Sequence, residues 1–315
     1  MTLNLDTYQA LGLHLEPNLE VNGHKPSDFM TYLAHDGDAA YHPCPEAYPG
    51  EDVPKGAITR HADWGETKIY PDTLRVISVY TPHGLDRSKA ARLIVFNDGA
   101  SYLDPKGAVR AAQVLDSLHA SGAIAATVAV FVNPGHAATD LAKSRGEINA
   151  AASAQRRSEY DALTPDFGRF LIEEVLPFVE ASEGLVLSKD PEHRIICGIS
   201  SGAICAFTVA WQFPDHFCRV LSHCGSFVNI LGGHNYAYMV GVTPAKPIRI
   251  YLQDGANDAT NVIGDWPLAN QTLARALEFA GYDHLFEYGT GAHNLRHGGA
   301  VFADSLRWLW RSAES

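Results

Sequence analysis

HRIICGISSGAICAF, residues 193–207, places two adjacent serines between two apolar segments. The first segment predicts a buried strand and the second a helix, with a glycine-rich turn between them. Only Ser200 has glycine at both −2 and +2, namely Gly198 and Gly202. A nucleophile elbow requires this spacing, because the strained backbone at the serine leaves no room for side chains at those positions. The stretch therefore predicts Ser200 as a nucleophile, and the alternative is an ordinary capping serine in a glycine-rich turn.

The composition is that of an acidic globular protein. The 315 residues are 46% hydrophobic, enough for a large core, and the formal net charge is −12 with no basic run. This charge argues against a nucleic acid or an anionic membrane as a partner. The longest apolar stretch, residues 122–135, is too short to span a bilayer, and the first 20 residues contain no secretion signal. A cytoplasmic location is expected, and a homo-oligomer is left open.

The cysteines give no framework for a metal or for disulfide bonds. There are five, an odd number, and they form no CxxC motif. We expect buried free thiols in a reducing compartment rather than a disulfide framework or a zinc site. The five are Cys44, Cys197, Cys205, Cys218 and Cys224.

The chain divides into two regions of different pattern. Residues 1–55 are weakly patterned and predict an N-terminal arm packed on the domain, with a flap over a cleft as the alternative. From residue 56 to residue 315, apolar strands alternate with amphipathic helices, which is typical of a mostly parallel sheet covered on both faces. We therefore predict one α/β catalytic domain over 56–315. Ligands bind such sheets beyond the carboxyl ends of the strands, so the loops there form one functional edge.

A nucleophilic serine needs a histidine base, and His293 is in the expected place. It lies in EYGTGAHNLRHGG, between the last predicted strand and the last predicted helix. This agrees with the chain order serine, acid, histidine. His297, four residues on, is the rival and could pair with His293 on a metal. The motif lacks the glutamate of HExxH, and its glycines predict a loop rather than a helix, so no metal is expected.

The acid that orients the imidazole is expected from the stretch IRIYLQDGANDATN. Asp254 and Asp258 both follow a predicted strand on the functional edge. Asp254 precedes Gly255 and has the position of a turn former, whereas Asp258 lies further out with reach toward the His293 loop. We predict Asp258 as the acid, with Asp254 as the alternative.

An oxyanion hole needs two backbone N–H groups on the same edge. One is expected from Ser201, the residue after the nucleophile. The other is expected from Ala100 in the loop after RLIVFNDG, because Gly99 allows a close approach of the backbone. A plain turn at this point is the alternative.

Taken together, seven segments of the chain resemble the enterochelin esterase and esterase D type of esterases, over about residues 56–312. The resemblance implies an α/β-hydrolase fold without a large lid, Ser200 as nucleophile, Asp258 as acid and His293 as base. It also implies carboxylic-ester hydrolysis through an acyl-enzyme without a cofactor. The segments are VFNDGASY, VFVNPG, RRSEYD, FLIEEVLPFVE, CGISSGAICAF, RIYLQDGAND and GAHN.

The sequence departs from many such relatives at three positions, so the resemblance says less about the substrate. Asp98, Ser201 and Ala292 stand where those relatives carry His, Met and Gly. The backbone roles survive these changes. True enterochelin esterases also carry a separate N-terminal domain, for which 55 residues are too few.

We expect a serine hydrolase acting on a small or aromatic carboxylic ester, its partner being that small-molecule substrate. The same residues could serve a lactonase, a siderophore trilactone esterase or an acyltransferase, and a catalytically silent binding protein is the alternative outside enzymes. A ferric siderophore is strongly anionic and finds only Arg156 and Arg157 as candidate cations. The candidate substrate-binding side chains are Arg157, His223 and Trp266, with His136 beside them.

Overall fold

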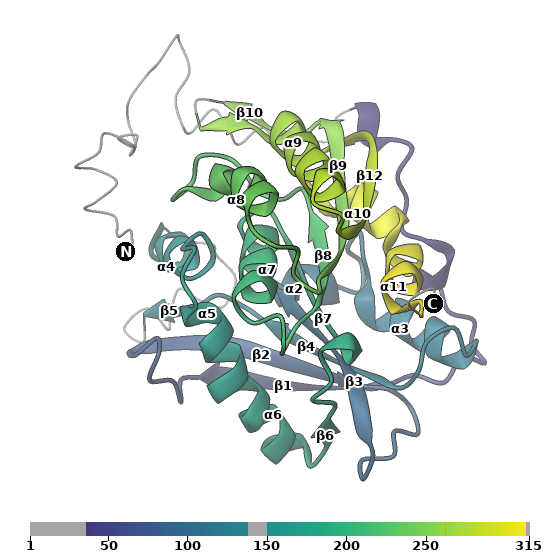
Figure 1. Ribbon diagram of the computed structural model, residues 1–315. Coiled ribbons are helices and arrows are strands. Elements are labelled where there is room, and N and C mark those ends of the chain that lie inside the picture. The colour runs from purple at the N-terminus through teal and green to yellow at the C-terminus, as the bar shows by residue number, and fades with distance from the viewer. Residues whose placement is uncertain (1–35, 138–149, 262, 313–315) are drawn as a thin grey trace.

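A ten-stranded, mostly parallel sheet forms the centre of the molecule (Figure 1). The computed structural model describes residues 36–137, 150–261 and 263–312. The strand order is β1-β2-β4-β3-β7-β8-β9-β12, with β5 paired to β2 and β6 paired to β3. The pairs β1–β2 and β2–β4 are antiparallel, and all pairs from β4–β3 to β9–β12 are parallel. The strands of this order are β1 (Ala57–Trp64), β2 (Thr73–Thr81), β4 (Thr127–Val132), β3 (Ala90–Asn97), β7 (Arg194–Ile199), β8 (Arg219–His223), β9 (Arg249–Asn257) and β12 (Asp283–Ala292).

The remaining elements are short strands and the helices between the main strands. The short strands are β5 (His136–Ala137), β6 (Val186–Leu187), and the separate pair β10 (Thr260–Asn261) and β11 (Gly264–Asp265). The helices are α2 (Gly99–Leu103), α3 (Ala111–Ala120), α4 (Ala150–Tyr160), α5 (Asp166–Arg169), α6 (Leu176–Glu183), α7 (Ser201–Gln212), α8 (Tyr236–Val242), α9 (Trp266–Phe279), α10 (Leu295–Ala300) and α11 (Phe302–Trp310). A π-helical turn, Phe170–Val175, joins α5 to α6.

Two hydrophobic cores lie on opposite faces of the sheet, as the continuous apolar strands predict. In β3, Leu93 and Val95 belong to the core shared with α5 to α9, whereas Ile94 and Phe96 belong to the core shared with α3 and α11. Successive residues of a strand point to opposite faces, so a strand that is apolar throughout has to be covered on both. The predicted α/β-hydrolase fold is confirmed. None of the described helices is long and apolar enough to cross a membrane.

The five cysteines and part of the predicted arm can be compared with the structure. All five cysteines are buried free thiols, as predicted. Of the predicted arm, residues 36–55 are described, and Cys44 and Ala47 are buried in the core beside α3 and α11. Residues 1–35 lie outside the described residues, so the domain boundary at 55 stays a prediction. The absence of a large lid also stays a prediction, because residues 138–149 after β5 are likewise outside.

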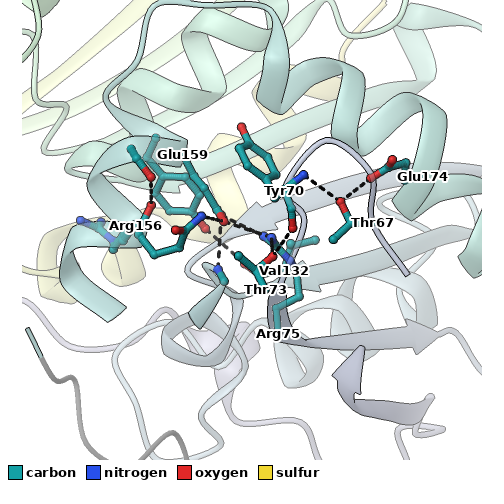
Figure 2. Close-up of polar contacts among 12 residues, drawn as sticks. Thr67, Tyr70, Thr73, Arg75, Val132, Arg156, Glu159 and Glu174 are labelled. Atoms are coloured by element: carbon teal, nitrogen blue, oxygen red, sulfur yellow. Dashed lines mark hydrogen bonds and ion pairs between the residues drawn. The ribbon is translucent and has the colours of Figure 1, made fainter. Parts of the chain in front are cut away.

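A buried ion pair fastens helix α4 to strand β2 (Figure 2). The Arg75 guanidinium donates to both carboxylate oxygens of Glu159 at 2.8 and 3.0 Å, and both side chains are 0% exposed. Gln155 donates to Glu159 at 2.8 Å, and Thr73 accepts from Arg75 at 3.1 Å. Losing one member of such a pair leaves the other charge buried and unpaired. The pair therefore fixes where α4 lies, and α4 also carries Arg156, which bonds Asp98 directly after β3.

We expect Glu159→Gln to lower the free energy of unfolding by about 3–5 kcal/mol, because the variant keeps the shape of the side chain but strands the Arg75 charge. Glu173→Gln is the matched control, since it breaks an ion pair with Arg169 on the surface. The Arg169 side chain is 46% exposed and that of Glu173 is 51% exposed. Such a surface pair contributes little, so this variant should unfold like the parent. Urea unfolding of the three proteins measures the difference. Equal unfolding of the two variants would show that the buried pair does not hold α4.

Candidate active site

Ser200 lies in a strained turn between β7 and α7. Its backbone has φ 58° and ψ −123°, a conformation that L residues rarely adopt. A Cβ on Gly198 would come within 2.2 Å of the backbone oxygen of Gly202, and a Cβ on Gly202 within 2.9 Å of Asp98 Oδ2. Gly198 is therefore needed for β7 and α7 to approach this closely, whereas a side chain at Gly202 would displace the Asp98 carboxylate from its place. The turn raises the Ser200 hydroxyl at the carboxyl end of the sheet.

The structure brings Ser200, His293 and Asp258 together in one hydrogen-bonded series. Ser200 Oγ donates to His293 Nε2 at 2.9 Å, and His293 Nδ1 donates to Asp258 Oδ1. His293 directly follows β12, and Asp258 directly follows β9, whereas Ser200 follows β7, which β8 separates from β9 in the sheet. His293 is only 8% exposed and Asp258 7%. This is the geometry in which an imidazole can take a proton from a serine.

Asp254 is not the turn former that the sequence suggested. It lies within β9 and is 0% exposed, because β9 extends further along the chain than expected. Its Oδ1 accepts from the Gly255 N–H at 2.8 Å, and its carboxyl group hydrogen-bonds that of Asp258. The Oδ2 atom of each carboxyl group is buried, and no N–H or hydroxyl group of the described residues donates a hydrogen bond to it. A hydrogen bond between the two carboxyl groups needs one proton, which one of them has to carry.

The electrostatics of the two carboxyls place that proton on Asp254. Burial raises the pKa of Asp254 well above its usual value, and the hydrogen bond to Asp258 and the Asp258 charge raise it further. Burial also opposes ionisation of Asp258, but the hydrogen bonds from Asp254 and His293 outweigh it and hold its pKa below the usual value. Asp258 is thus the ionised partner that faces the imidazole.

The two predicted oxyanion donors belong to the first turns of α7 and α2. Ser201 is the first residue of α7, and its hydroxyl hydrogen-bonds Asp161 at the end of α4. Ala100 lies in α2, and its N–H donates to the Asn133 side-chain oxygen at 2.9 Å. Asn133 follows β4 in the segment VFVNPG, and its place beside Ala100 was not expected from the sequence.

The loop before Ala100 is clamped by α4. Asp98 has a left-handed backbone, with φ 54° and ψ 41°. Arg156 donates to both carboxylate oxygens of Asp98, at 2.8 and 2.7 Å, and Tyr160 Oη accepts from the Asp98 N–H at 3.2 Å. Figure 2 shows Arg156 and the buried Glu159 on the same helix. Arg156 is therefore engaged with Asp98 and holds this loop, and a role for it in binding an anionic substrate stays a prediction.

Residues of the N-terminal region brace the loop that carries His293. Asp38 is 0% exposed and accepts from the Ala292 N–H at 2.9 Å and from Asn294 Nδ2 at 2.7 Å. These two residues flank His293 in the chain. Tyr41 Oη also accepts from the Thr290 N–H at 2.9 Å. Part of the region predicted to be a packed arm therefore fixes the position of the imidazole.

The candidate substrate-binding side chains differ in how far they are exposed. His223 is 0% exposed, and its Nδ1 shares a hydrogen bond with Tyr102 Oη at 2.9 Å, so it cannot touch a substrate here. Burial lowers the pKa of His223 to about 3. Trp266 is also 0% exposed and packs edge-on against His293, with ring centroids 5.7 Å apart. Arg157 on α4 is exposed, and His136 in β5 is partly exposed; a substrate role for either stays a prediction.

His297 does not share a metal-binding group with His293. It lies in helix α10, not in a loop as expected, and is 2% exposed. Its imidazole stacks on Tyr41 at 4.1 Å, and its Nδ1 is 3.1 Å from Gln253 Nε2. Among the described residues, one group of potential ligand atoms lies within 4.8 Å, namely those of Cys224, Asp258 and His293. In that group His293 and Asp258 are already bonded to each other.

Comparison with known proteins bears on the family and the fold of the chain. Residues 71–306 match the family described as "Putative esterase". Among solved structures, the ferric enterobactin esterase of Salmonella typhimurium superposes with a TM-score of 0.64 at 20% identity, over 83% of this chain and 61% of that one. A ferulic acid esterase of the fungus Anaeromyces mucronatus superposes with a TM-score of 0.63 at 18% identity, over 84% of this chain and 95% of that one. No curated protein sequence gives a significant match.

The family match spans most of the chain, so the chain belongs to this esterase family. The solved structures show the same fold at low identity. The chain spans about three fifths of the length of the enterobactin esterases it matches. The substrate and the roles of individual residues belong to the proposal below.

Replacing either aspartate by asparagine separates their roles. We expect Asp258→Asn to lower kcat about 10⁴-fold with KM little changed, because the amide favours the wrong imidazole tautomer. Asp254→Asn should lower kcat less than about tenfold, since an amide N–H can donate to Asp258 in place of the acid proton. Asp254→Ala has no side-chain donor for Asp258, so its kcat should lie between the values of the two asparagine variants. Steady-state kinetics and thermal midpoints of the three variants test this. A crippled Asp254→Asn beside a near-normal Asp258→Asn reverses the assignment.

Proposed function

We propose that this protein is a serine esterase that cleaves a small or aromatic carboxylic ester through an acyl-enzyme. One observation carries the proposal above all: Ser200 Oγ lies 2.9 Å from His293 Nε2, and the other nitrogen of the ring bonds Asp258. Family membership supports ester hydrolysis as the class of reaction. The strained turn at Ser200 supports its place as nucleophile, since it holds the hydroxyl clear of the backbone.

In the acylation step, Ser200 Oγ attacks the ester carbonyl while its proton passes to His293 Nε2. The carbonyl electron pair moves to oxygen and gives a tetrahedral oxyanion. Asp258 stabilises the imidazolium that forms, because it is ionised and bonded to Nδ1. The imidazolium then returns the proton to the alcohol as the carbon–oxygen bond of the ester breaks. The product of this step is the acyl-Ser200 ester and a free alcohol.

In the second step, water hydrolyses the acyl-enzyme with the same order of proton transfers. His293 takes a proton from the water as it attacks the acyl carbon, and a second tetrahedral oxyanion forms. When this collapses, Ser200 Oγ leaves and recovers its proton from His293. The carboxylic acid is released and the starting enzyme is restored.

The N–H groups of Ala100 and Ser201 are the donors we propose for the oxyanion. The Ala100 N–H donates to Asn133 Oδ1 in this structure, so the oxyanion has to replace the amide oxygen of Asn133 as acceptor. The exchange is favourable because a negatively charged oxygen is the stronger acceptor. The clamp from Arg156 to Asp98 holds this backbone in place during the exchange.

Charge favours an uncharged small or aromatic ester over a ferric siderophore. The chain carries a net charge of −12. Of the two arginines considered for an anionic substrate, Arg156 is bonded to Asp98 and only Arg157 is exposed. An acidic enzyme repels a strongly anionic substrate more than it attracts it.

The two adjacent serines give the test. We expect Ser200→Ala to lower kcat by several orders of magnitude, because it removes the attacking oxygen. Ser201→Ala should lower kcat less than about tenfold, since Ser201 contributes its backbone N–H, which alanine keeps. Turnover of p-nitrophenyl esters of graded chain length measures both variants and the preferred acyl group.

Retention of full activity by Ser200→Ala would contradict the proposed function, and a dead Ser201→Ala would move the nucleophile by one residue. Failure of the parent protein to turn over any ester of the series would favour a binding protein that has kept the fold.

A further inference from the structure

Ser226 touches the nucleophile, although no sequence motif singles it out. It lies in the loop after β8 and is 0% exposed. Its Oγ is 3.1 Å from Ser200 Oγ, and its backbone N–H donates to the Ser200 carbonyl oxygen at 3.2 Å. Two contacts therefore join Ser226 to the strained residue of the turn.

The direction of the hydroxyl hydrogen bonds follows from the neighbours. Trp266 Nε1 can only donate, and it donates to Ser226 Oγ at 3.2 Å. His293 donates through Nδ1 to the ionised Asp258, so its Nε2 accepts the Ser200 proton. Because each serine has one hydroxyl proton, the proton between the two serines has to come from Ser226. The hydrogen bonds thus run in one direction: Trp266 donates to Ser226, Ser226 donates to Ser200, and Ser200 donates to His293.

The loop that carries Ser226 is held in place by helix α9. Asn270 donates through Nδ2 to the Gly225 carbonyl oxygen at 2.9 Å and to the Trp266 carbonyl oxygen at 3.0 Å. Trp266 is on the same helix, and its ring packs against His293. One helix therefore positions both the donor to Ser226 and a wall of the imidazole site.

We propose that Ser226 is a further catalytic residue of this esterase, donating a hydrogen bond to Ser200 Oγ; the inference rests on the function proposed above. The bond keeps Oγ in one rotamer and directs the Ser200 proton to His293 Nε2. As that proton leaves and the bond to the carbonyl carbon forms, Ser226 stabilises the charge that develops on Oγ. It does so again when Oγ departs from the second tetrahedral intermediate. Ser226 keeps its own proton throughout, and Trp266 is the positioning residue that orients it.

Ser226→Ala tests the assignment directly. We expect kcat to fall about 10- to 100-fold with KM changed less than twofold, the size of effect typical of a hydrogen bond to a charged atom. The second-order rate of inactivation by a p-nitrophenyl phosphonate should fall by the same factor, because it reports the reactivity of Ser200 without the later steps. Trp266→Phe keeps a ring beside His293 and removes the N–H, so both rates should fall in the same direction by about three- to tenfold.

Ser222→Ala is the matched control. Ser222 is also a fully buried serine, in β8, and its hydroxyl has no partner among the described residues. This variant should keep kcat and the phosphonate rate within twofold of the parent, with a similar thermal midpoint.

Equal kinetics of Ser226→Ala and Ser222→Ala would overturn the role of Ser226 while leaving the proposed function intact. If Ser226→Ala fails to fold, Trp266→Phe is the variant that tests the proposal. An unchanged kcat and an unchanged rate of phosphonate inactivation in Trp266→Phe would then overturn it. Full activity in Ser200→Ala is the separate result that would remove the proposed function itself.

Discussion

The backbone of Ser200 is the constraint on which the rest of the site depends. A φ of 58° at a residue with a side chain costs about 1–3 kcal/mol and persists only when the surroundings impose it. Here the Ser200 N–H donates to the His223 carbonyl oxygen at 3.0 Å, and the Ser200 carbonyl oxygen accepts from Ser226. Gly198 lets β7 and α7 approach closely enough for these bonds. The strain is thus balanced by hydrogen bonds to the last residue of β8 and to the loop that follows it, and the turn keeps the hydroxyl at the functional edge of the sheet.

Each loop at that edge is held by a second element, usually through a buried polar group. Asp38 holds the loop of His293, Arg156 holds the loop of Ala100, and Asp254 bonds the carboxyl of Asp258. Such groups are costly when unsatisfied, so each one fixes a single position for the loop it bonds. The precision of the site therefore comes from contacts between segments far apart in the sequence. The N-terminal region and α4, which lie outside the chemistry, take part in it.

Much of this arrangement could be predicted because it depends on local rules. Glycines at −2 and +2 indicate a turn at Ser200, the strand–helix alternation indicates the sheet, and the place of His293 follows from chain order. Ser226, Asn133 and the burial of Asp254 could not be predicted in this way. Their roles depend on which strands are neighbours and on the direction of each side chain. Trp266 illustrates the limit: its position near the site was expected, but its burial and its hydrogen bond to Ser226 depend on how α9 packs against the loop after β8.

The central claim is that Ser200 alone is the acylated nucleophile. Treating the protein with a p-nitrophenyl phosphonate until activity is lost, followed by intact-mass and peptide mass spectrometry, tests it most directly. The account predicts one adduct per chain, on the peptide containing Ser200 and localised to its hydroxyl. An adduct on Ser201, on Ser226 or on another residue, or complete loss of activity without any covalent adduct, would contradict it.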